Sequence, residues 1–295
     1  KENIFKKKKK TSPKLIVSTY GMLPDTFETF YIAENISNGS KLILNQHGPR
    51  FSNIKNNFSF NHELSISDMY LVPNKIKKSK KIINLGSLKT IENIYNKSED
   101  KILFLMLTKG RYNRLIDTEF NNIKQLHKYY KFICPGFYSI LNNKLKAKLI
   151  FRSARKNYWN EKEILKKHCK LAKVDFNREG TNYFEIASRS KIVICSYLST
   201  AFFETLHINK PVILFSPFPN TSYNSKTLKV LKIMKKNNIF FNNHEDAANF
   251  INKNWNEIEK WWYSKKVQSS RKLFLKLFFF KNSNMIKDFQ LLINR

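Results

Sequence analysis

Residues 191–215 read KIVICSYLSTAFFETLHINKPVILF, and this stretch predicts a strand, a short loop, a helix and a second strand. The uninterrupted apolar run Ile192–Cys195 is typical of a strand that is buried on both faces of a sheet. Ser199 and Thr200 carry hydroxyl groups that can cap the helix that follows them. An Asn-Lys-Pro sequence ends this helix, and Val212–Phe215 forms the next buried strand. The stretch therefore reads as one repeating unit of a parallel α/β sheet.

The start of the predicted helix is also a candidate phosphate site. It follows the carboxyl end of a parallel strand, where free backbone N–H groups and the helix dipole attract an anion. Glu204 lies one turn further on, within reach of a ribose hydroxyl if a nucleotide occupies the site. The alternative interpretation is that Ser199 or Thr200 only caps the helix and that Glu204 is a solvated acid.

Strand and helix patterns alternate along the rest of the chain. Further strands are expected at residues 14–18, 41–45, 69–72, 81–86, 102–107, 148–151, 174–176 and 239–241. Helices are expected at residues 25–37, 118–131, 160–171, 182–189, 223–236, 244–263, 267–280 and 283–294. This alternation indicates doubly wound parallel sheets, and the pattern restarts after the polar stretch 89–101. The predicted fold class is α/β, with two Rossmann-like domains.

These patterns divide the chain into four expected regions. Residues 1–13 form a basic tail or linker, and residues 14–97 form the carboxyl-terminal part of an amino-terminal, acceptor-side domain. Residues 98–265 form a domain that binds the nucleotide donor. Residues 266–295 form helices that pack back across the domains. We expect the amino-terminal domain to be incomplete, because the sequence begins without a methionine and without an obvious domain start.

The composition is strongly basic. The chain has 54 Lys and Arg against 22 Asp and Glu, for a formal net charge of +32. Nucleic acid, anionic lipid headgroups and phosphorylated substrates are all partners that fit such a charge. Because no apolar segment reaches membrane-spanning length, the expected localisation is cytoplasmic, including a peripheral position on the inner face of the cell membrane.

The sequence lacks the motifs that mark several common kinds of functional site. The three cysteines are widely spaced without a CxxC, which predicts a reducing compartment and no structural zinc. The sequence also lacks an Asp-x-Asp pair, a P-loop, G-x-G-x-x-G and G-x-S-x-G, so kinase, dehydrogenase and serine-hydrolase interpretations lose their main support. A bound diphosphate would then be neutralised by arginines and a helix start, with no metal ion.

Four arginines follow two of the predicted strands. Arg111 and Arg114 come after one strand, and Arg152 and Arg155 come after another. A guanidinium group can hold a phosphate through two parallel hydrogen bonds. In so basic a chain any single arginine is more commonly a surface charge. The coincidence of four with two strand ends favours a phosphate site.

A histidine and a glycine follow the strand at 41–45. His47 titrates near neutrality, and Gly48 lets the backbone approach a ligand closely. His47 could act as a general base toward an acceptor hydroxyl or donate to a phosphate oxygen, and the alternative is a hydrogen-bonded loop histidine. Glu63 and Asp68 are the second choice for a catalytic base, although both could be ordinary caps or ion-pair partners.

Aromatic residues interleave with lysines in three places. The pair Tyr129-Tyr130, the run Trp261–Tyr263 and the run Phe278–Phe280 have the composition of a surface for single-stranded nucleic acid. The helical spacing of the tryptophans favours packing in the core instead. The segment 272–281 could likewise be a membrane-surface helix or pack on the first domain.

Several segments, in order along the chain, resemble the surface-carbohydrate transferases encoded in O-antigen-type loci. The matching segments are Lys41–Gly48 (KLILNQHG), His62-Glu63 with Ile66-Ser67-Asp68, Arg111-Tyr112, Arg152 with Tyr158-Trp159, Ser199-Thr200 with Glu204-Thr205-Leu206, Asn209-Lys210-Pro211, and Trp262-Tyr263 with Gln268. This family is related to GT-B glycosyltransferases and to CDP-glycerol glycerophosphotransferases. The chain departs from the family pattern at 49–51, where Pro-Arg-Phe replaces further glycines and an aromatic residue.

The resemblance implies a GT-B fold with the active site in the cleft between two Rossmann-like domains. It implies no metal and no cofactor, since a nucleotide sugar or a CDP-polyol is the co-substrate. It places Ser199, Thr200 and Glu204 at the phosphate and ribose of the donor. It also places His47 in the cleft, contributed by the first domain.

Our hypothesis from the sequence is a metal-independent transferase that moves a sugar from a nucleotide-activated donor to a surface glycan or a lipid-linked acceptor. Arg111, Arg152, Gly48 and the helix start would hold the donor phosphates, and His47 would take the acceptor proton or orient the donor. One alternative is a polyol-phosphate transferase of the CDP-glycerol type. Others are a non-enzymatic protein that binds nucleic acid or another polyanion, and a truncated transferase domain without activity.

Overall fold

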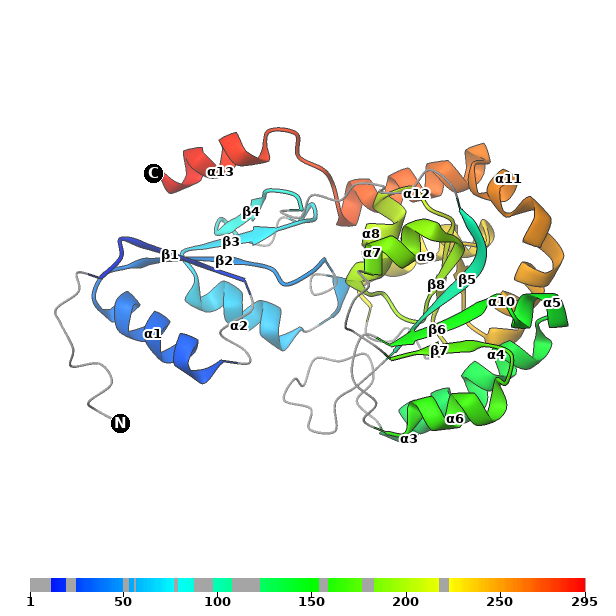
Figure 1. The fold of residues 1–295 in the computed structure, drawn as a ribbon. Helices are drawn as coiled ribbons and strands as arrows, with labels where there is room; N and C mark the ends of the chain where they lie inside the picture. Colours follow the sequence, from blue (N-terminus) through cyan, green and yellow to red (C-terminus); the bar gives the residue numbers. More distant parts are fainter. Residues whose placement is uncertain are drawn as a thin grey trace.

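Two parallel β-sheets organise the protein. The computed structural model describes residues 12–19, 25–49, 53–55, 57–76, 79–87, 98–107, 123–153, 159–176, 183–217 and 223–294. A four-stranded sheet is built from the first part of the chain and a six-stranded sheet from the rest. Figure 1 shows the two sheets next to each other, each with its own helices.

The four-stranded sheet has the strand order β1-β2-β3-β4. Its strands are β1 (Leu15–Ser18), β2 (Lys41–Asn45), β3 (Met69–Val72) and β4 (Ile82–Asn84). All three pairings are parallel, so the loops after the strands gather at one edge of the sheet. Those loops include the segment that carries His47.

Two helices cover one face of this sheet. Helix α1 (Thr26–Ser37) begins at Asp25, whose carboxylate accepts the N–H groups of Phe27 and Glu28. Helix α2 (Phe58–Ile66) begins at Asn57, which caps the N–H of Phe60. The sequence patterns do not predict α2, because its buried face mixes serine, phenylalanine and glutamate and so has no apolar stripe.

The last helix of the chain covers the opposite face of the same sheet. Helix α13 (Met285–Ile293) places Met285, Phe289 and Leu292 against the strand residues Ile43 and Leu71. These three side chains have the spacing of one helical face. In Figure 1 this helix lies above β3 and β4, at the far end of the chain from the strands that it covers.

The six-stranded sheet has the order β10-β9-β8-β5-β6-β7, with every pairing parallel. Its strands are β5 (Glu99–Met106), β6 (Leu149–Ser153), β7 (Lys173–Asp175), β8 (Ser190–Cys195), β9 (Val212–Phe215) and β10 (Phe240–Phe241). The chain builds outward from β5 in one direction and from β8 in the other. In such sheets, ligands bind outside the carboxyl ends of the strands where the order reverses, here beside β5 and β8.

Strand β8 is buried on both faces, as its apolar run predicts. Ile192 and Ile194 belong to one core cluster, and Val193 and Cys195 belong to the other. On the first face lie α4 (Cys134–Ile140), α5 (Asn143–Lys146), α6 (Glu161–His168) and α10 (His244–Asn254). On the second face lie α7 (Tyr183–Arg189), α8 (Thr200–His207), α9 (Ser225–Lys236) and α12 (Lys265–Phe278).

The helix expected over 118–131 has a different form where the structure describes it. A short α3 (Ile123–Lys128) passes into a π-helical turn, Tyr129–Ile133, and then into α4. The turn buries both tyrosines, and the Tyr130 hydroxyl donates to the carbonyl of Leu107 at the end of β5. This aromatic pair is therefore part of the core and not a surface for nucleic acid.

The helix expected over 244–263 is interrupted. Helix α10 is followed by a 3-10 turn, Trp255–Glu257, and by α11 (Ile258–Trp262). The Trp255 ring is 8% exposed, and the ammonium groups of Lys148 and Lys191 lie over it. Trp262 is fully buried and Trp261 packs partly buried against both core clusters, which confirms the core interpretation for the tryptophans, whereas Tyr263 is 57% exposed. Within the described ranges, no helix combines the length and the apolar character needed to cross a bilayer.

Candidate functional site

A cavity of about 260 Å³ lies where the two sheets meet. The first sheet contributes Thr19, Asn45, Gln46, His47, Gly48, Pro49, Pro73, Gly86 and Ser87, and the second half of the chain contributes Thr200, Glu204 and Phe279. The residues from the first sheet follow the carboxyl ends of its four strands. Thr200 and Glu204 come from the start of α8, which follows β8. We call this space the cleft cavity.

Helix α8 presents its first turn to the cleft cavity. Ser199 is the cap residue, and its hydroxyl accepts the N–H of Phe202 at 3.3 Å. The capping role considered for Ser199 is therefore real, and it leaves the earliest N–H groups of the helix without intrahelical partners. Thr200 and Glu204 lie one turn apart on the side that lines the cavity. Glu204 is only 3% exposed, so its carboxylate belongs to the cavity wall and not to the solvated surface.

The turn that carries His47 lies against the first turn of α8. Gly48 has a φ of +75°, and a Cβ added to it would lie 2.6 Å from the Thr200 hydroxyl oxygen. Glycine is needed here for two reasons, the left-handed backbone and the closeness of the neighbouring helix. The structure thus brings together the two segments that the sequence singled out separately.

His47 is in a position to act as a base. Its side chain lies at the exposed rim of the cleft cavity. Partial desolvation in the cleft lowers its pKa from the ordinary value of 6.5, so the ring is neutral at physiological pH. A neutral imidazole can accept a proton from a hydroxyl group.

Arg152 has an ion-pair partner outside the cavity lining. Its guanidinium donates to the Asp175 carboxylate at 2.7 Å, linking the ends of β6 and β7, and both side chains are largely buried. A role in holding a donor phosphate stays a prediction, because this charge is already balanced by a carboxylate. Arg111, Arg114 and Arg155 lie outside the described residues.

Glu63 and Asp68 also have structural partners. Glu63 accepts the Tyr70 hydroxyl at 2.6 Å inside the first sheet's core, and burial raises the pKa of its carboxyl group. Asp68 accepts the backbone N–H of Leu42 at 2.7 Å. Neither residue lines the cleft cavity. The structure therefore favours the structural alternatives that were weighed for them and leaves His47 as the base candidate in the cavity.

Metal and thiol chemistry find no site in the part of the chain that the structure describes. No group of three or more His, Cys, Asp and Glu side chains is arranged there to hold a metal ion. Cys134, Cys169 and Cys195 are buried, and burial raises the pKa of each thiol, to about 12 for Cys169. Buried thiols with raised pKa values are poor nucleophiles.

Sequence reasoning missed several residues of the cavity wall. Gln46 and Phe279 are the most prominent, since both are almost completely buried beside it. The available signal for Gln46 was its place directly after β2, next to His47. Phe279 had no such signal, because it follows a helix and reaches the cavity only through the path of α12 toward the first sheet.

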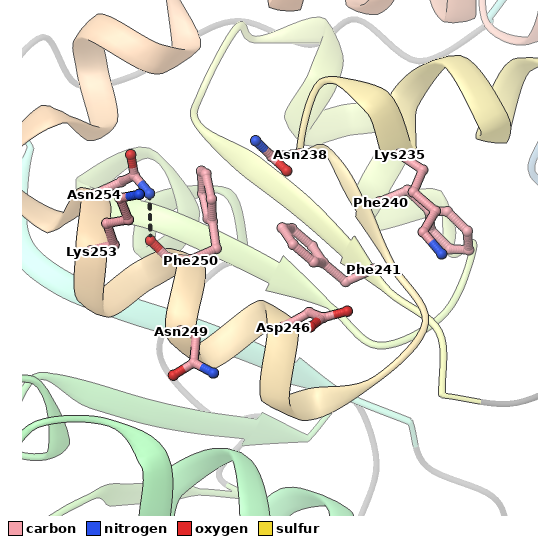
Figure 2. A pocket seen from close by; sticks show the side chains of 9 residues that line it. All are labelled: Lys235, Asn238, Phe240, Phe241, Asp246, Asn249, Phe250, Lys253 and Asn254. Carbon is pink, nitrogen blue, oxygen red and sulfur yellow. Dashed lines mark hydrogen bonds between the residues drawn. The ribbon is translucent and has the colours of Figure 1, made fainter.

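A second hollow of about 470 Å³ lies at the open edge of the six-stranded sheet, remote from the predicted site residues. Figure 2 shows its wall, in which Phe241 and Phe250 stand between polar side chains of α9, α10 and the connecting turn. Some of these polar groups are engaged with neighbours. Lys235 donates to Asn242, and Asn254 donates to the Phe250 carbonyl at 2.8 Å. The hollow therefore resembles the solvated margin of a sheet edge more than a ligand site.

Solved structures share this fold at low sequence identity. The Listeria monocytogenes protein described as a UDP-N-acetylglucosamine 2-epimerase has a TM-score of 0.58 and 10% identity, covering 96% of this chain and 74% of that one. S. aureus MnaA, solved with UDP, has a TM-score of 0.51 and 12% identity over 96% and 76% of the two chains. The wall teichoic acid polymerase TagF, solved with CDPG, has a TM-score of 0.50 and 13% identity over 88% and 70%. The fold is GT-B, as the resemblance implied.

Comparison at the level of sequence identifies a family. No curated protein matches the chain closely enough to be recognised as its relative. A family model described as LIC12162 family transferase matches residues 1–293, nearly the whole chain. The protein therefore belongs to the LIC12162 family of transferases.

Proposed function

We propose that this transferase moves a sugar from a nucleotide-activated donor to a hydroxyl group of a glycan or lipid-linked acceptor in cell-surface polysaccharide synthesis. The observation that carries the proposal is the meeting of His47 and Gly48 with Thr200 and Glu204 around one cavity. Two polar segments from different sheets have no need to converge for stability alone. A group-transfer site between two domains requires such convergence, because donor and acceptor must be held together.

The start of α8 would receive the diphosphate of the donor. Its first N–H groups and the positive end of its dipole attract an anion, and the Thr200 hydroxyl can donate to a phosphate oxygen. The Glu204 carboxylate, one turn along, can accept hydrogen bonds from ribose hydroxyls. S. aureus MnaA and TagF, which share the fold, were solved with UDP and CDPG, which supports a nucleotide donor.

His47 would act on the acceptor. The acceptor oxygen forms a bond to the anomeric carbon of the donor sugar while the bond from that carbon to the phosphate oxygen breaks. The nucleoside diphosphate leaves with the electron pair, and its developing charge is stabilised at the α8 start. The acceptor proton passes to the neutral imidazole of His47.

A polyol-phosphate transfer is the second candidate, favoured by the similarity to TagF. In that reaction the acceptor oxygen attacks phosphorus and the nucleoside monophosphate leaves. The same cavity residues would serve, with the α8 start holding the phosphate that is transferred. A CDP-linked polyol and a nucleotide sugar in one binding panel separate the two reactions.

The basic surface would keep the enzyme near an anionic membrane that carries a lipid-linked acceptor. Lys229, Lys232 and Lys236 are exposed on α9, a helix without a single acidic residue. Each such lysine near an anionic surface contributes on the order of 1 kcal/mol of attraction. Sedimentation with phosphatidylglycerol vesicles, compared with phosphatidylcholine vesicles, tests this association independently of activity.

The first test is thermal stabilisation by UDP-, GDP-, CMP-, CDP- and dTDP-linked donors, with and without EDTA and at two salt concentrations. We expect saturable stabilisation by one nucleotide family that EDTA does not reduce. Equal stabilisation by every polyanion, abolished by salt, would instead support a polyanion-binding protein.

Turnover of the donor so identified then tests the site. His47→Ala and Thr200→Ala should lose at least a hundredfold in activity, in line with a lost general base or phosphate contact. His62→Ala is the matched control, because His62 is an exposed histidine of α2 that does not line the cavity. Full activity of the folded His47→Ala and Thr200→Ala variants would refute the site.

A further inference from the structure

We propose that Gln46 is a specificity-determining residue whose side-chain oxygen accepts a hydrogen bond from a hydroxyl group of the donor's sugar. The inference rests on the proposed function and adds a residue that neither the sequence motifs nor the family similarity assigns. It concerns the part of the cleft cavity beside His47. It does not concern the α8 start, where the diphosphate is expected.

The backbone holds Gln46 rigidly in place. The residue follows β2 directly, and its N–H donates to the carbonyl of Leu71 on β3 at 2.9 Å. Its side chain is 2% exposed and lines the cleft cavity together with His47 and Glu204. A long polar side chain that is so completely buried needs partners at both ends of its amide group.

One end of the amide has a clear partner. The Gln46 Nε2 group donates to the carbonyl oxygen of Gly48 at 2.6 Å. Because a carbonyl oxygen can only accept, this contact fixes which end of the amide is nitrogen and which is oxygen. The same bond folds the Gly48 turn against the strand end and so positions His47.

The other end of the amide has no partner in the described part of the chain. Gln46 Oε1 is buried and accepts no hydrogen bond among the residues that the structure describes. A buried acceptor without a donor is costly, so native proteins leave few of them unless a ligand supplies the donor. The partner must carry an O–H or N–H group, and since none of the described residues supplies it, we assign it to a ligand in the cavity.

The chemistry of the cavity indicates which donor this is. Phosphate oxygens carry few protons at neutral pH and cannot satisfy Oε1, whereas every hydroxyl of a sugar can. Gln46 belongs to the same strand end as the proposed base His47 and lines the cavity from the first sheet, whereas Thr200 and Glu204 line it from α8. The ribose is expected beside Glu204 on α8, so the group next to Gln46 is the sugar to be transferred. Phe279 and two prolines give this region the apolar surface that packs against the C–H faces of a sugar ring.

The test compares a nucleotide sugar with its bare nucleoside diphosphate by isothermal titration calorimetry. Gln46→Met keeps the length of the side chain and removes its acceptor together with the amide donor to the Gly48 carbonyl. We expect this variant to bind the nucleotide sugar about tenfold more weakly and to bind the nucleoside diphosphate as the wild type does. Gln290→Met, at an exposed site on α13, is the control for the substitution.

A second variant separates ligand contact from support of the turn. In Gln46→Glu a protonated carboxyl group can still donate to the Gly48 carbonyl and still accept from the sugar, whereas an ionised one cannot donate. The ratio of the affinity for the nucleotide sugar to the affinity for the nucleoside diphosphate should therefore approach the wild-type ratio in this variant at low pH. It should stay there as the buried carboxyl group ionises, because a carboxylate still accepts from the sugar hydroxyl. Both affinities should decrease together as the bond to the Gly48 carbonyl is lost, while the ratio in Gln46→Met stays low throughout.

Each outcome is decisive. Equal weakening of both ligands in Gln46→Met would mean that the residue only supports the turn, and unchanged binding of both would mean that it contacts neither; each would overturn the assignment. If the folded wild type bound no nucleotide sugar at all, the proposed function would fail first and the role of Gln46 with it. The wild-type measurement distinguishes these cases.

Discussion

The contact between Gly48 and Thr200 makes a quantitative prediction about the junction of the two sheets. A methyl group at Gly48 would lie 2.6 Å from the Thr200 hydroxyl oxygen, about 0.8 Å closer than an ordinary contact of 3.4 Å. The φ of +75° adds a backbone penalty of about 1–2 kcal/mol for a residue with a Cβ. Moving the Thr200 side chain from its rotamer costs about 1 kcal/mol more. Gly48→Ala should therefore destabilise the protein by about 2–3 kcal/mol.

A second glycine provides the matched control. Gly39, after α1, has a φ of +95°, and a Cβ added to it would meet nothing within 4 Å. Gly39→Ala should lower the free energy of unfolding only by the penalty for a Cβ at a positive φ, about 1–2 kcal/mol. In a Thr200→Ala background the cost of Gly48→Ala should fall to the same value, because the overlapping hydroxyl is gone.

The assay is equilibrium unfolding in urea, followed by fluorescence and by circular dichroism to check that the two transitions coincide. Nucleotide binding by the same variants reports on the cleft, since the clash can also be relieved by a slight separation of the two sheets. If Gly48→Ala cost no more than Gly39→Ala and did not respond to Thr200→Ala, the two segments would not be in contact in solution. The site built on that contact would then be wrong.

Four further predictions follow from individual contacts. Burial raises the pKa of Glu63 above 4.5, so the folded state favours the protonated carboxyl group. The free energy of unfolding of the wild type, relative to that of Glu63→Gln, should therefore be largest below pH 4.5 and should decline as pH rises through the raised pKa. Urea unfolding at several pH values measures this difference. Arg152→Met should lower the free energy of unfolding by about 3 kcal/mol, because it leaves the buried Asp175 carboxylate without this guanidinium. The double variant Arg152→Met with Asp175→Leu should lower it by less, because it removes that carboxylate as well. Arg271 donates to the carbonyls of Leu206 and His207 at the end of α8, so Arg271→Met should cost about 2 kcal/mol in the same assay, and a cost near zero would contradict the contact. If His47 is the base, kcat/KM should fall at low pH as the imidazole is protonated, and its lowered pKa places the midpoint of this fall below pH 6.5. A midpoint above pH 6.5 would argue against His47 as the base.

Most elements of the fold could be predicted from local sequence patterns. The strands at 41–45, 69–72 and 212–215 have the predicted bounds, because short apolar runs between turn signals leave little choice of length. Helix α2 was missed because its inner face is partly polar. The break at Trp255 was missed because the ring is held by Lys148, just before β6, and by Lys191 of β8, which no local pattern contains.

The candidate site could be predicted only in pieces. His47 and Thr200 were recognisable because each follows a strand, and parallel strands end at a common edge. Glu63 was the second choice for the base in the sequence, and the structure pairs it with Tyr70 in the core of the first sheet. Arg152 follows a strand in the sequence, and only the structure shows that Asp175 on the neighbouring strand pairs with it, so its role at a phosphate stays a prediction.

The sequence by itself determined the class of fold, two parallel sheets with helical crossovers, and the strand ends at which polar residues gather. These properties depend on hydrophobic periods and caps, which act over a few residues. Only the tertiary structure decided which strand ends face each other, because β2 and β8 are far apart in the chain and their approach depends on the packing of whole sheets. That approach seats Gly48 against Thr200, buries Gln46 beside the cavity and brings Phe279 across from α12 to complete the wall.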